Sequence, residues 1–133
     1  MEDSPTGPIL VRPYQIIFRI SLELNGVLSP DFPAILDTGY NLNLSISEEH
    51  LRDWAGMSLR KIGSARINDN EVVLRQSNIA VHGKNPLVLN LDAGIAVHGA
   101  GPRLPTLGLR ALVKNNIKLV VVGGWAHLSR GWF

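Results

Sequence analysis

A short apolar run that ends in an aspartate constrains this chain more than any other stretch. The run spans residues 34–36, and Asp37-Thr38-Gly39 follows it directly. Such a run predicts a buried strand, and Gly39 has access to backbone conformations that other residues avoid, so we expect a turn there. A carboxylate at the end of a buried strand loses hydration energy unless nearby groups bind it. The Thr38 hydroxyl and the N–H groups of the turn are expected to hold Asp37.

Strand-like patterns lie on both sides of this stretch. Apolar residues occupy every second position over residues 14–24, and the hairpin signal Asn25-Gly26 follows. A return strand, interrupted at residues 29–31, leads into the turn, and the alternation resumes over residues 42–46. We therefore expect a β-hairpin that carries the aspartate turn at the end of its second strand.

The remainder of the chain predicts more strands and two short helices. Ser47 is a suitable N-cap for a helix that begins at Glu48, and Gly56 is a natural stop for it. Asn68 to Asn70 form a strong turn signal. The other expected elements are strands at residues 59–67, 71–82, 86–91 and 95–97, a loop at 98–105, a helix at 109–115, and a terminal hairpin at 117–129. Strands at this spacing are typical of a sandwiched or closed β domain.

Length and composition indicate one globular domain. The chain has 133 residues, of which 45% are hydrophobic and 18% charged, so it can bury a core and is neither disordered nor membrane-spanning. Residues 1–9 read as a loose N-terminal arm and residues 10–133 as the domain. No signal peptide is visible after Met1, and no apolar run is long enough to cross a bilayer. We expect a cytoplasmic location and no membrane partner.

Composition also narrows the chemistry. Cysteine is absent, which excludes disulfides and thiolate catalysis. The net charge is only +2 and no block of Lys or Arg occurs, so no nucleic-acid partner is expected. The four histidines lack metal-ligand spacing, and we expect surface or hydrogen-bonded roles for them; they are His50, His82, His98 and His127. The sequence predicts no metal and no cofactor.

Two segments carry a resemblance to a known family. The first, residues 34–39 with Asp37-Thr38-Gly39, resembles the catalytic loop of the retropepsin-like aspartic proteases. The second, residues 104–112 with Leu107-Gly108, resembles the family's second signature, in which a glycine opens a short helix beneath the catalytic loop. The resemblance covers roughly residues 14–130 and suits the single-lobed, bacterial-type members.

The resemblance implies a fold and an assembly. The fold is mainly β, a closed, barrel-like acid protease lobe with one or two short helices, in which the Gly108 strand crosses the Asp37 strand in a psi-shaped loop. Two carboxylates that share one proton activate water in such enzymes, because like charges close together resist joint ionisation. The chain has one usable Asp-Thr-Gly. A homodimer is therefore expected to supply the second Asp37.

By the same resemblance the protein is an aspartic endopeptidase, a hydrolase acting on a peptide or protein substrate. Asp37, Thr38 and Gly39 are the expected catalytic residues. Thr38 would hydrogen-bond across the two-fold axis, and Gly39 would direct an N–H toward the carboxylates. Tyr40 replaces the small residue that often follows this motif, so we expect it to reshape the substrate channel.

A mobile hairpin, the flap, covers the substrate in this family. Two segments compete for its tip, residues 62–65 and residues 68–70. The substrate-binding residues we expect are Tyr40 and the first of these segments, Ile62, Gly63, Ser64 and Ala65.

Other interpretations stay open at this point. Asp37 also suits an ordinary capped turn, or a catalytically inactive dimerisation or peptide-binding module that keeps the loop as scaffold. A small-molecule-binding β barrel is a third possibility. Asp92-Ala93-Gly94 does not qualify as a second catalytic loop, because Ala93 lacks the hydroxyl and the chain has no room for a second lobe. A turn between strands is expected there.

Overall fold

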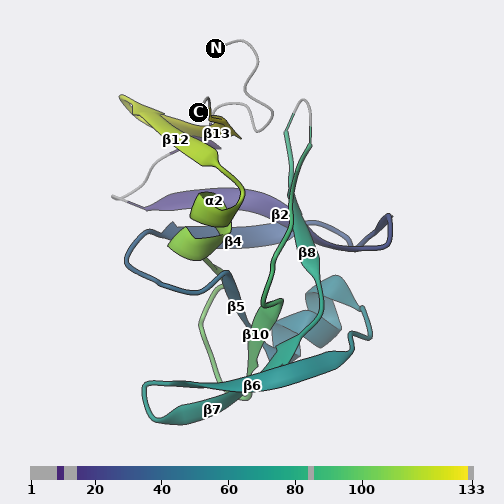
Figure 1. Ribbon diagram of the computed structural model, residues 1–133. Helices are drawn as coiled ribbons and strands as arrows, with labels where there is room; N and C mark the ends of the chain where they lie inside the picture. The colour runs from purple at the N-terminus through teal and green to yellow at the C-terminus, as the bar shows by residue number, and fades with distance from the viewer. Residues whose placement is uncertain (1–8, 11–14, 84–85, 132–133) are drawn as a thin grey trace.

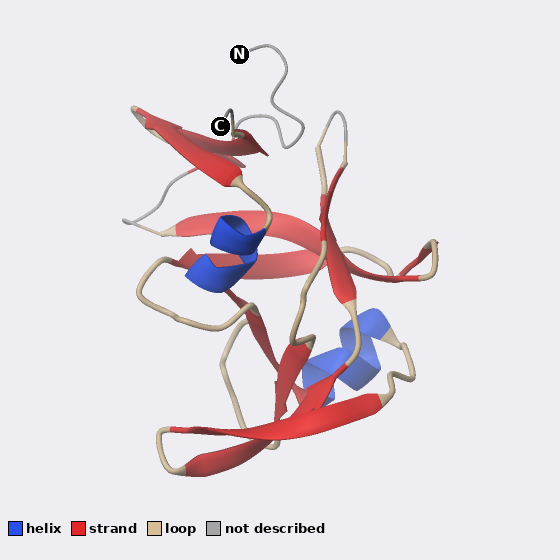
Figure 2. Ribbon diagram, viewed as in Figure 1, coloured by secondary structure: helices blue, strands red, loops and turns tan. Residues whose placement is uncertain are grey.

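Strands dominate the part of the chain that the computed structural model describes, residues 9–10, 15–83 and 86–131 (Figures 1 and 2). The strands are β1 (Ile9–Leu10), β2 (Ile16–Leu24), β3 (Val27–Leu28), β4 (Phe32–Asp37), β5 (Leu44–Ser47), β6 (Lys61–Ile67), β7 (Asn70–Arg75), β8 (Asn78–Val81), β9 (Leu87–Leu89), β10 (Ile95–His98), β11 (Thr106–Gly108), β12 (Ile117–Val122) and β13 (Trp125–Arg130). The helical segments are α1 (Glu48–His50), the π-helical segment η1 (Leu51–Ala55) that continues it, and α2 (Leu109–Lys114).

The strands form two sheets. The larger has the order β6-β7-β10-β5-β11-β4-β2-β8-β9, with β3 attached to β2, and the smaller has the order β1-β13-β12. The expectation of a mainly β chain is confirmed, but a closed barrel is wrong. Among the described residues, β6 and β9 each pair on one side only, so the large sheet stays open. The Arg130 side chain on β13 donates to the Val88 carbonyl oxygen of β9 at 3.2 Å, which occupies a backbone acceptor of that strand.

The psi-shaped crossing is present. Strand β11 lies between β4, to which it is parallel, and β5, to which it is antiparallel. The register places Gly108 opposite Asp37 and Leu107 opposite both Leu36 and Leu44. Leu107 is fully buried between its neighbours. Because β11 comes from a distant part of the chain and pairs with both β4 and β5, the position of Asp37 depends on long-range pairing as well as on its own strand.

A single apolar core lies beneath these strands. In β2, Phe18, Ile20 and Leu22 are buried in the core at every second position, as the sequence pattern predicts, although Ser21 is buried as well, and α2 contributes its buried face. The largest fully buried members are Phe18, Phe32, Ile20, Leu22, Leu44, Ile46, Ile79, Leu89, Ile95, Leu107, Leu128 and Val81. Burial of these apolar side chains stabilises the strands, and thereby the turns at the strand ends that carry polar residues.

Local signals set the ends of several elements. Asn25 and Gly26 both have positive φ, 53° and 84°, as the tight hairpin turn requires. The Ser47 hydroxyl accepts the N–H of His50 at 3.0 Å, and Gly56 ends the helical segment with φ of 63°. The predicted helix is confirmed, although its last part is π-helical.

No helix in the described part of the chain combines the length and the apolar character needed to span a bilayer.

The N-terminal boundary differs in detail from the expectation. Residues 1–8 of the expected arm, and Tyr14 of the expected first strand, lie outside the described residues. Ile9 was expected in the arm, whereas in the structure it is in β1 and pairs with Ala126 of β13. Pairing with a distant strand was not visible in the local sequence.

An ion pair connects the turn before β10 to α2. Arg110 Nη2 lies 2.6 Å from Asp92 Oδ2, and Arg110 Nε lies 3.1 Å from Oδ1. The amide of Asn43 donates to Asp92 Oδ1 at 3.4 Å and to the Gly94 carbonyl oxygen at 3.2 Å. Hydrogen bonds from Arg110 lower the pKa of Asp92 to about 2. Asp92 therefore has a structural partner, and the turn expected at this position is confirmed.

Replacing Asp92 with Asn should remove a pH-dependent part of the stability. The folded pKa lies below the usual 3.8, so the pair stabilises the fold at neutral pH and loses that contribution as pH falls from about 4 to about 2. Thermal denaturation should show a lower midpoint for Asp92→Asn at neutral pH and a smaller difference near pH 2. Both side chains are about 40% exposed, 37% and 43%, so the effect is small. A difference that stays constant with pH contradicts this assignment.

Candidate active site

Asp37 is the last residue of β4, and its side chain is exposed. The Gly39 N–H donates to Asp37 Oδ1 at 2.9 Å, and the Tyr40 N–H donates to the Asp37 carbonyl oxygen at 3.1 Å. The N–H expected from Gly39 is therefore present. The other oxygen, Oδ2, has no hydrogen-bond partner among the described residues. The turn thus orients the carboxylate and leaves one oxygen available.

The reason for a glycine at position 39 differs from the expectation. Its φ lies outside the left-handed region, so the turn does not need a conformation reserved for glycine there. A Cβ on Gly39 would instead lie 3.3 Å from Asp37 Oδ1, which is a tight contact. Close approach of the carboxylate to the backbone favours glycine at this position. Thr38 is exposed beside it, and its role across a dimer axis stays a prediction.

The second motif lies against the first, as the resemblance implied. The Gly108 N–H donates to the Asn43 carbonyl oxygen, and the Leu109 N–H donates to the Tyr40 carbonyl oxygen, both at 2.8 Å. A Cβ on Gly108 would lie 1.9 Å from the Leu42 carbonyl oxygen. The backbone at Gly108 therefore packs directly against the loop that follows Asp37.

Asp37 opens into a cavity of about 350 Å³. The lining comes from the turn after β4, from β5, from the β6–β7 hairpin and from the loop after β10; it consists of Asp37, Tyr40, Ser45, Ile67, Asn68, Asn70, His98, Ala100, Gly101, Pro102 and Thr106. Polar side chains form more than half of this list. The cavity can therefore hold a hydrogen-bonding ligand next to the carboxylate.

The structure shows which of the two candidate segments is a hairpin tip, and the role of that tip as a flap stays a prediction. Asn68 and Asp69 have φ of 49° and 66°, which a tight two-residue turn requires and which Asn and Asp tolerate. Asn68 and Asn70 line the Asp37 cavity. The interpretation of residues 62–65 as a tip is wrong, because they lie within β6, where Gly63 pairs with Leu74 of β7.

The remaining expected residues fall on different surfaces. Ile62, Gly63, Ser64 and Ala65 are not among the residues that line the Asp37 cavity; Ala65 lines a small separate cavity with Leu74. Their role in substrate binding stays a prediction. Tyr40 lines the same cavity as Asp37, and its expected effect on the substrate channel stays a prediction.

A chain of hydrogen bonds in this cavity was missed by sequence reasoning. The Tyr40 hydroxyl bonds to Ser45 Oγ, and Ser45 Oγ bonds to His98 Nε2 at 2.8 Å. Ser45 is buried in β5, and burial raises the pKa of Tyr40 and lowers the pKa of His98. The only hint in the sequence was Ser45 itself, a polar residue among the apolar residues of a strand. Its partner His98 is on β10, and that parallel pairing is not readable from local sequence.

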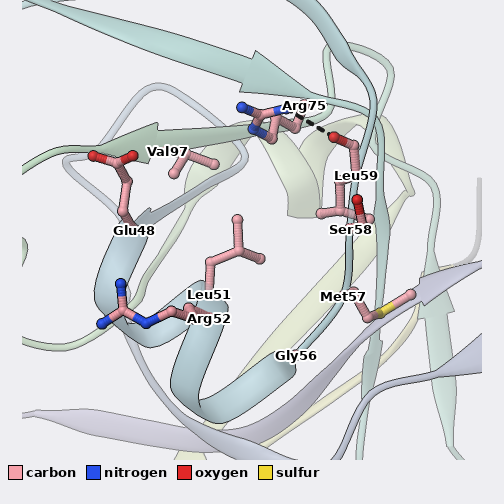
Figure 3. Close-up of a pocket in the computed structure, with 9 residues that line it drawn as sticks. All are labelled: Glu48, Leu51, Arg52, Gly56, Met57, Ser58, Leu59, Arg75 and Val97. Atoms are coloured by element: carbon pink, nitrogen blue, oxygen red, sulfur yellow. Dashed lines mark hydrogen bonds between the residues drawn. The ribbon is translucent and has the colours of Figure 1, made fainter.

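Another cavity, larger than that at Asp37, lies elsewhere and measures about 540 Å³ (Figure 3). It is lined by Glu48, Leu51, Arg52, Gly56, Met57, Ser58, Leu59, Arg75 and Val97. Its charged residues are Glu48, Arg52 and Arg75, and Arg75 donates to the Leu59 carbonyl oxygen at 2.8 Å. Glu48 is its only carboxylate, so no acid–base pair is formed there. Within the described residues, no three His, Asp or Glu side chains gather as a metal site.

Comparison with known proteins identifies the fold. The chain is similar to the crystal structure of a retropepsin-like aspartic protease from Rickettsia conorii, with a TM-score of 0.61 and 15% sequence identity. The alignment covers 92% of this chain and 89% of that chain. No family model and no curated protein sequence matches. The structural likeness confirms a retropepsin-like fold, and 15% identity carries no more than the fold.

Proposed function

We propose that this protein is an aspartic endopeptidase in which Asp37 and the Asp37 of a second copy activate a water molecule. One observation carries the proposal most directly: an exposed carboxylate, oriented by the Gly39 N–H, opens into a cavity that the β6–β7 hairpin tip also lines. The retropepsin-like fold places this arrangement on a scaffold known to support peptide hydrolysis. Fold alone does not imply function, so the proposal rests on the site as well.

The chemistry requires two carboxylates with one proton between them. The ionised carboxylate takes a proton from the water molecule while the water oxygen attacks the peptide carbonyl carbon. The protonated carboxyl group donates its proton to the carbonyl oxygen. The resulting tetrahedral intermediate loses the amine when its nitrogen is protonated and the C–N bond breaks. Asp37 alone cannot hold both protonation states at once. A second copy is therefore part of the proposed site.

The arrangement of the chain supports a symmetric dimer. In the view of Figure 1, the turn after β4, the tip of the β6–β7 hairpin and the tip of the β12–β13 hairpin all lie toward the left. The β12–β13 hairpin also exposes large apolar side chains, with Val121 49%, Val122 68% and Trp125 53% exposed. Val122 and Trp125 pair across the two strands and so lie on one face of the hairpin, which suits a surface that a partner covers. A two-fold axis on this side would bring two copies of Asp37 together.

Replacing Thr38 with Ala should weaken the dimer more than the fold. In the proposed dimer each Thr38 hydroxyl bonds across the axis, and two lost hydrogen bonds correspond to about a tenfold or larger rise in the dimer dissociation constant. Sedimentation equilibrium measures that constant, and thermal denaturation measures the fold. Ser58→Ala removes an exposed hydroxyl far from the axis and serves as the matched control. An unchanged constant in Thr38→Ala contradicts the bracing role.

The function itself is tested by cleavage of an unfolded protein substrate between about pH 3 and about pH 7. We expect activity that is blocked by a transition-state mimic of peptide hydrolysis and that falls steeply on dilution below the dimer dissociation constant. A chain shown to be dimeric that cleaves nothing over this range overturns the proposal.

One observation favours a second candidate, a peptide-binding module without catalysis. Tyr40 lies in the cavity beside Asp37, in the position where the family usually has a small residue, and its hydroxyl is already bonded to Ser45. This side chain takes up space in the cavity that the carboxylate lines. Calorimetric titration of a dimeric sample with unfolded peptides, showing binding without products, identifies this alternative.

A further inference from the structure

The side chains of Tyr40, Ser45 and His98 form a continuous hydrogen-bonded chain, and all three line the cavity that contains Asp37. They come from the turn after β4, from β5 and from β10. Tyr40 is also bound through its backbone, since its N–H donates to the Asp37 carbonyl oxygen and its own carbonyl oxygen accepts the Leu109 N–H. The chain therefore connects the aspartate turn to a histidine on another strand.

The number of protons in this chain restricts its direction. Ser45 has a single hydroxyl proton, is 4% exposed and has no other hydrogen-bond partner among the described residues. When His98 Nε2 is unprotonated, it accepts that proton, and Ser45 in turn accepts from the Tyr40 hydroxyl. When Nε2 carries a proton, it donates to Ser45, and the Ser45 proton turns to the Tyr40 oxygen. The Tyr40 proton is then free to donate elsewhere.

We propose that His98 is a positioning residue for peptide cleavage: its protonation reverses the hydrogen bonds through Ser45 and thereby releases the Tyr40 hydroxyl to donate into the Asp37 cavity. This inference rests on the proposed function. Tyr40 and Asp37 line the same cavity, so the released hydroxyl can donate to an acceptor that is bound there. The acceptor gains a hydrogen bond only while His98 is charged.

The surroundings of His98 allow it to change charge. In the neutral ring that accepts from Ser45 through Nε2, the proton is on Nδ1, which has no hydrogen-bond partner among the described residues, so the proton gained on charging goes to Nε2. Burial lowers the pKa of His98, which moves the reversal to the acid side of the ordinary value of 6.5. Strand β10, which carries His98, pairs with β5, whose only polar side chains are hydroxyls, and with β7. The titratable or charged groups on the other elements around it are Asp37, Tyr40, Glu48, Asp69, Glu71 and Arg103.

The pH dependence of kcat/KM is the first test. In the wild type, kcat/KM should rise about three- to tenfold as His98 becomes protonated, which is the effect of one added hydrogen bond in the transition state. That step should vanish in Tyr40→Phe, which has no hydroxyl, and in His98→Gln, which has no ionisation. His82→Gln is the matched control, because His82 Nε2 bonds to Ser21 Oγ at 2.6 Å in the same way but lies outside the Asp37 cavity.

A second readout does not depend on activity. Proton NMR of the inactive Asp37→Asn protein should show the Tyr40 ring signals shifting with the same midpoint as those of the His98 ring. Ser45→Ala should remove this coupling while both rings remain. Thermal denaturation checks that Ser45→Ala folds. If this variant does not fold, the kcat/KM profile of Tyr40→Phe takes its place as the test.

The outcomes separate this inference from the proposed function. Tyr40 signals that do not follow His98, or a kinetic step that survives in Tyr40→Phe, overturn the positioning role while the protease assignment stands. A dimeric wild type without cleavage overturns the protease assignment and the positioning role with it, even where the two rings titrate together. Coupled rings and a step lost in both variants but kept in His82→Gln establish the inference.

Discussion

Asp37→Asn is expected to lower peptide cleavage by about a hundredfold to ten-thousandfold, which is the range for loss of a general acid–base group. Asparagine has nearly the same shape as aspartate and can accept the same hydrogen bond from the Gly39 N–H. It cannot take a proton from water or share one with a partner. A dimer of this variant has no base in the site, while its fold and its interface remain.

Two controls sharpen this experiment. Asp53→Asn changes an exposed carboxylate that is paired with Arg52, away from the Asp37 cavity, and should keep wild-type activity. Mixing wild type with an excess of Asp37→Asn should lower activity as mixed dimers form, because each mixed dimer has one aspartate. Retained cleavage in the pure variant contradicts the mechanism. Activity unaffected by mixing shows instead that each copy has a complete site.

Gly108→Ala should destabilise the fold by about 3 kcal/mol or more. The added Cβ would lie 1.9 Å from the Leu42 carbonyl oxygen, 2.7 Å from Tyr40 Cδ2 and 2.9 Å from the Tyr40 carbonyl oxygen. Two of these three contacts are with backbone atoms, which cannot move aside by a rotamer change. Either β11 separates from the loop after Asp37 or the loop itself shifts, and activity is lost with it.

Gly63→Ala is the matched control for this substitution. Gly63 is in β6, and a Cβ there would lie 3.8 Å from Leu74 Cδ1, an ordinary contact. Chemical denaturation followed by circular dichroism should give a free energy of unfolding close to that of the wild type for Gly63→Ala and a large loss for Gly108→Ala. Equal values for the two variants contradict the close approach at Gly108.

Much of the secondary structure and the position of the aspartate turn followed from local sequence. Alternation over residues 14–24 predicts β2, and the Asn25-Gly26 pair predicts the turn after it. An apolar run before Asp37 and a glycine at position 108 identify the two segments that meet in the structure. These features are local because backbone conformation and burial periodicity depend on residues a few positions apart.

Only the tertiary structure shows which segment is the tip of the β6–β7 hairpin and that the large sheet stays open. Residues 62–65 and 68–70 both contain turn-forming residues, and only pairing along β6 and β7 shows which of them bends the chain. Whether β6 and β9 meet depends on the twist accumulated over the whole sheet, which no short segment specifies.

The chain of Tyr40, Ser45 and His98 also belongs to the tertiary structure. Ser45 and His98 are 53 positions apart and meet because β5 and β10 pair in parallel. Local propensity indicates that a segment is a strand, but it does not select that strand's neighbour, since the pairing is decided by competition among all strands for the same core. The sequence therefore determined the aspartate turn and the strands around it, and the folded chain alone decided which side chains surround the carboxylate.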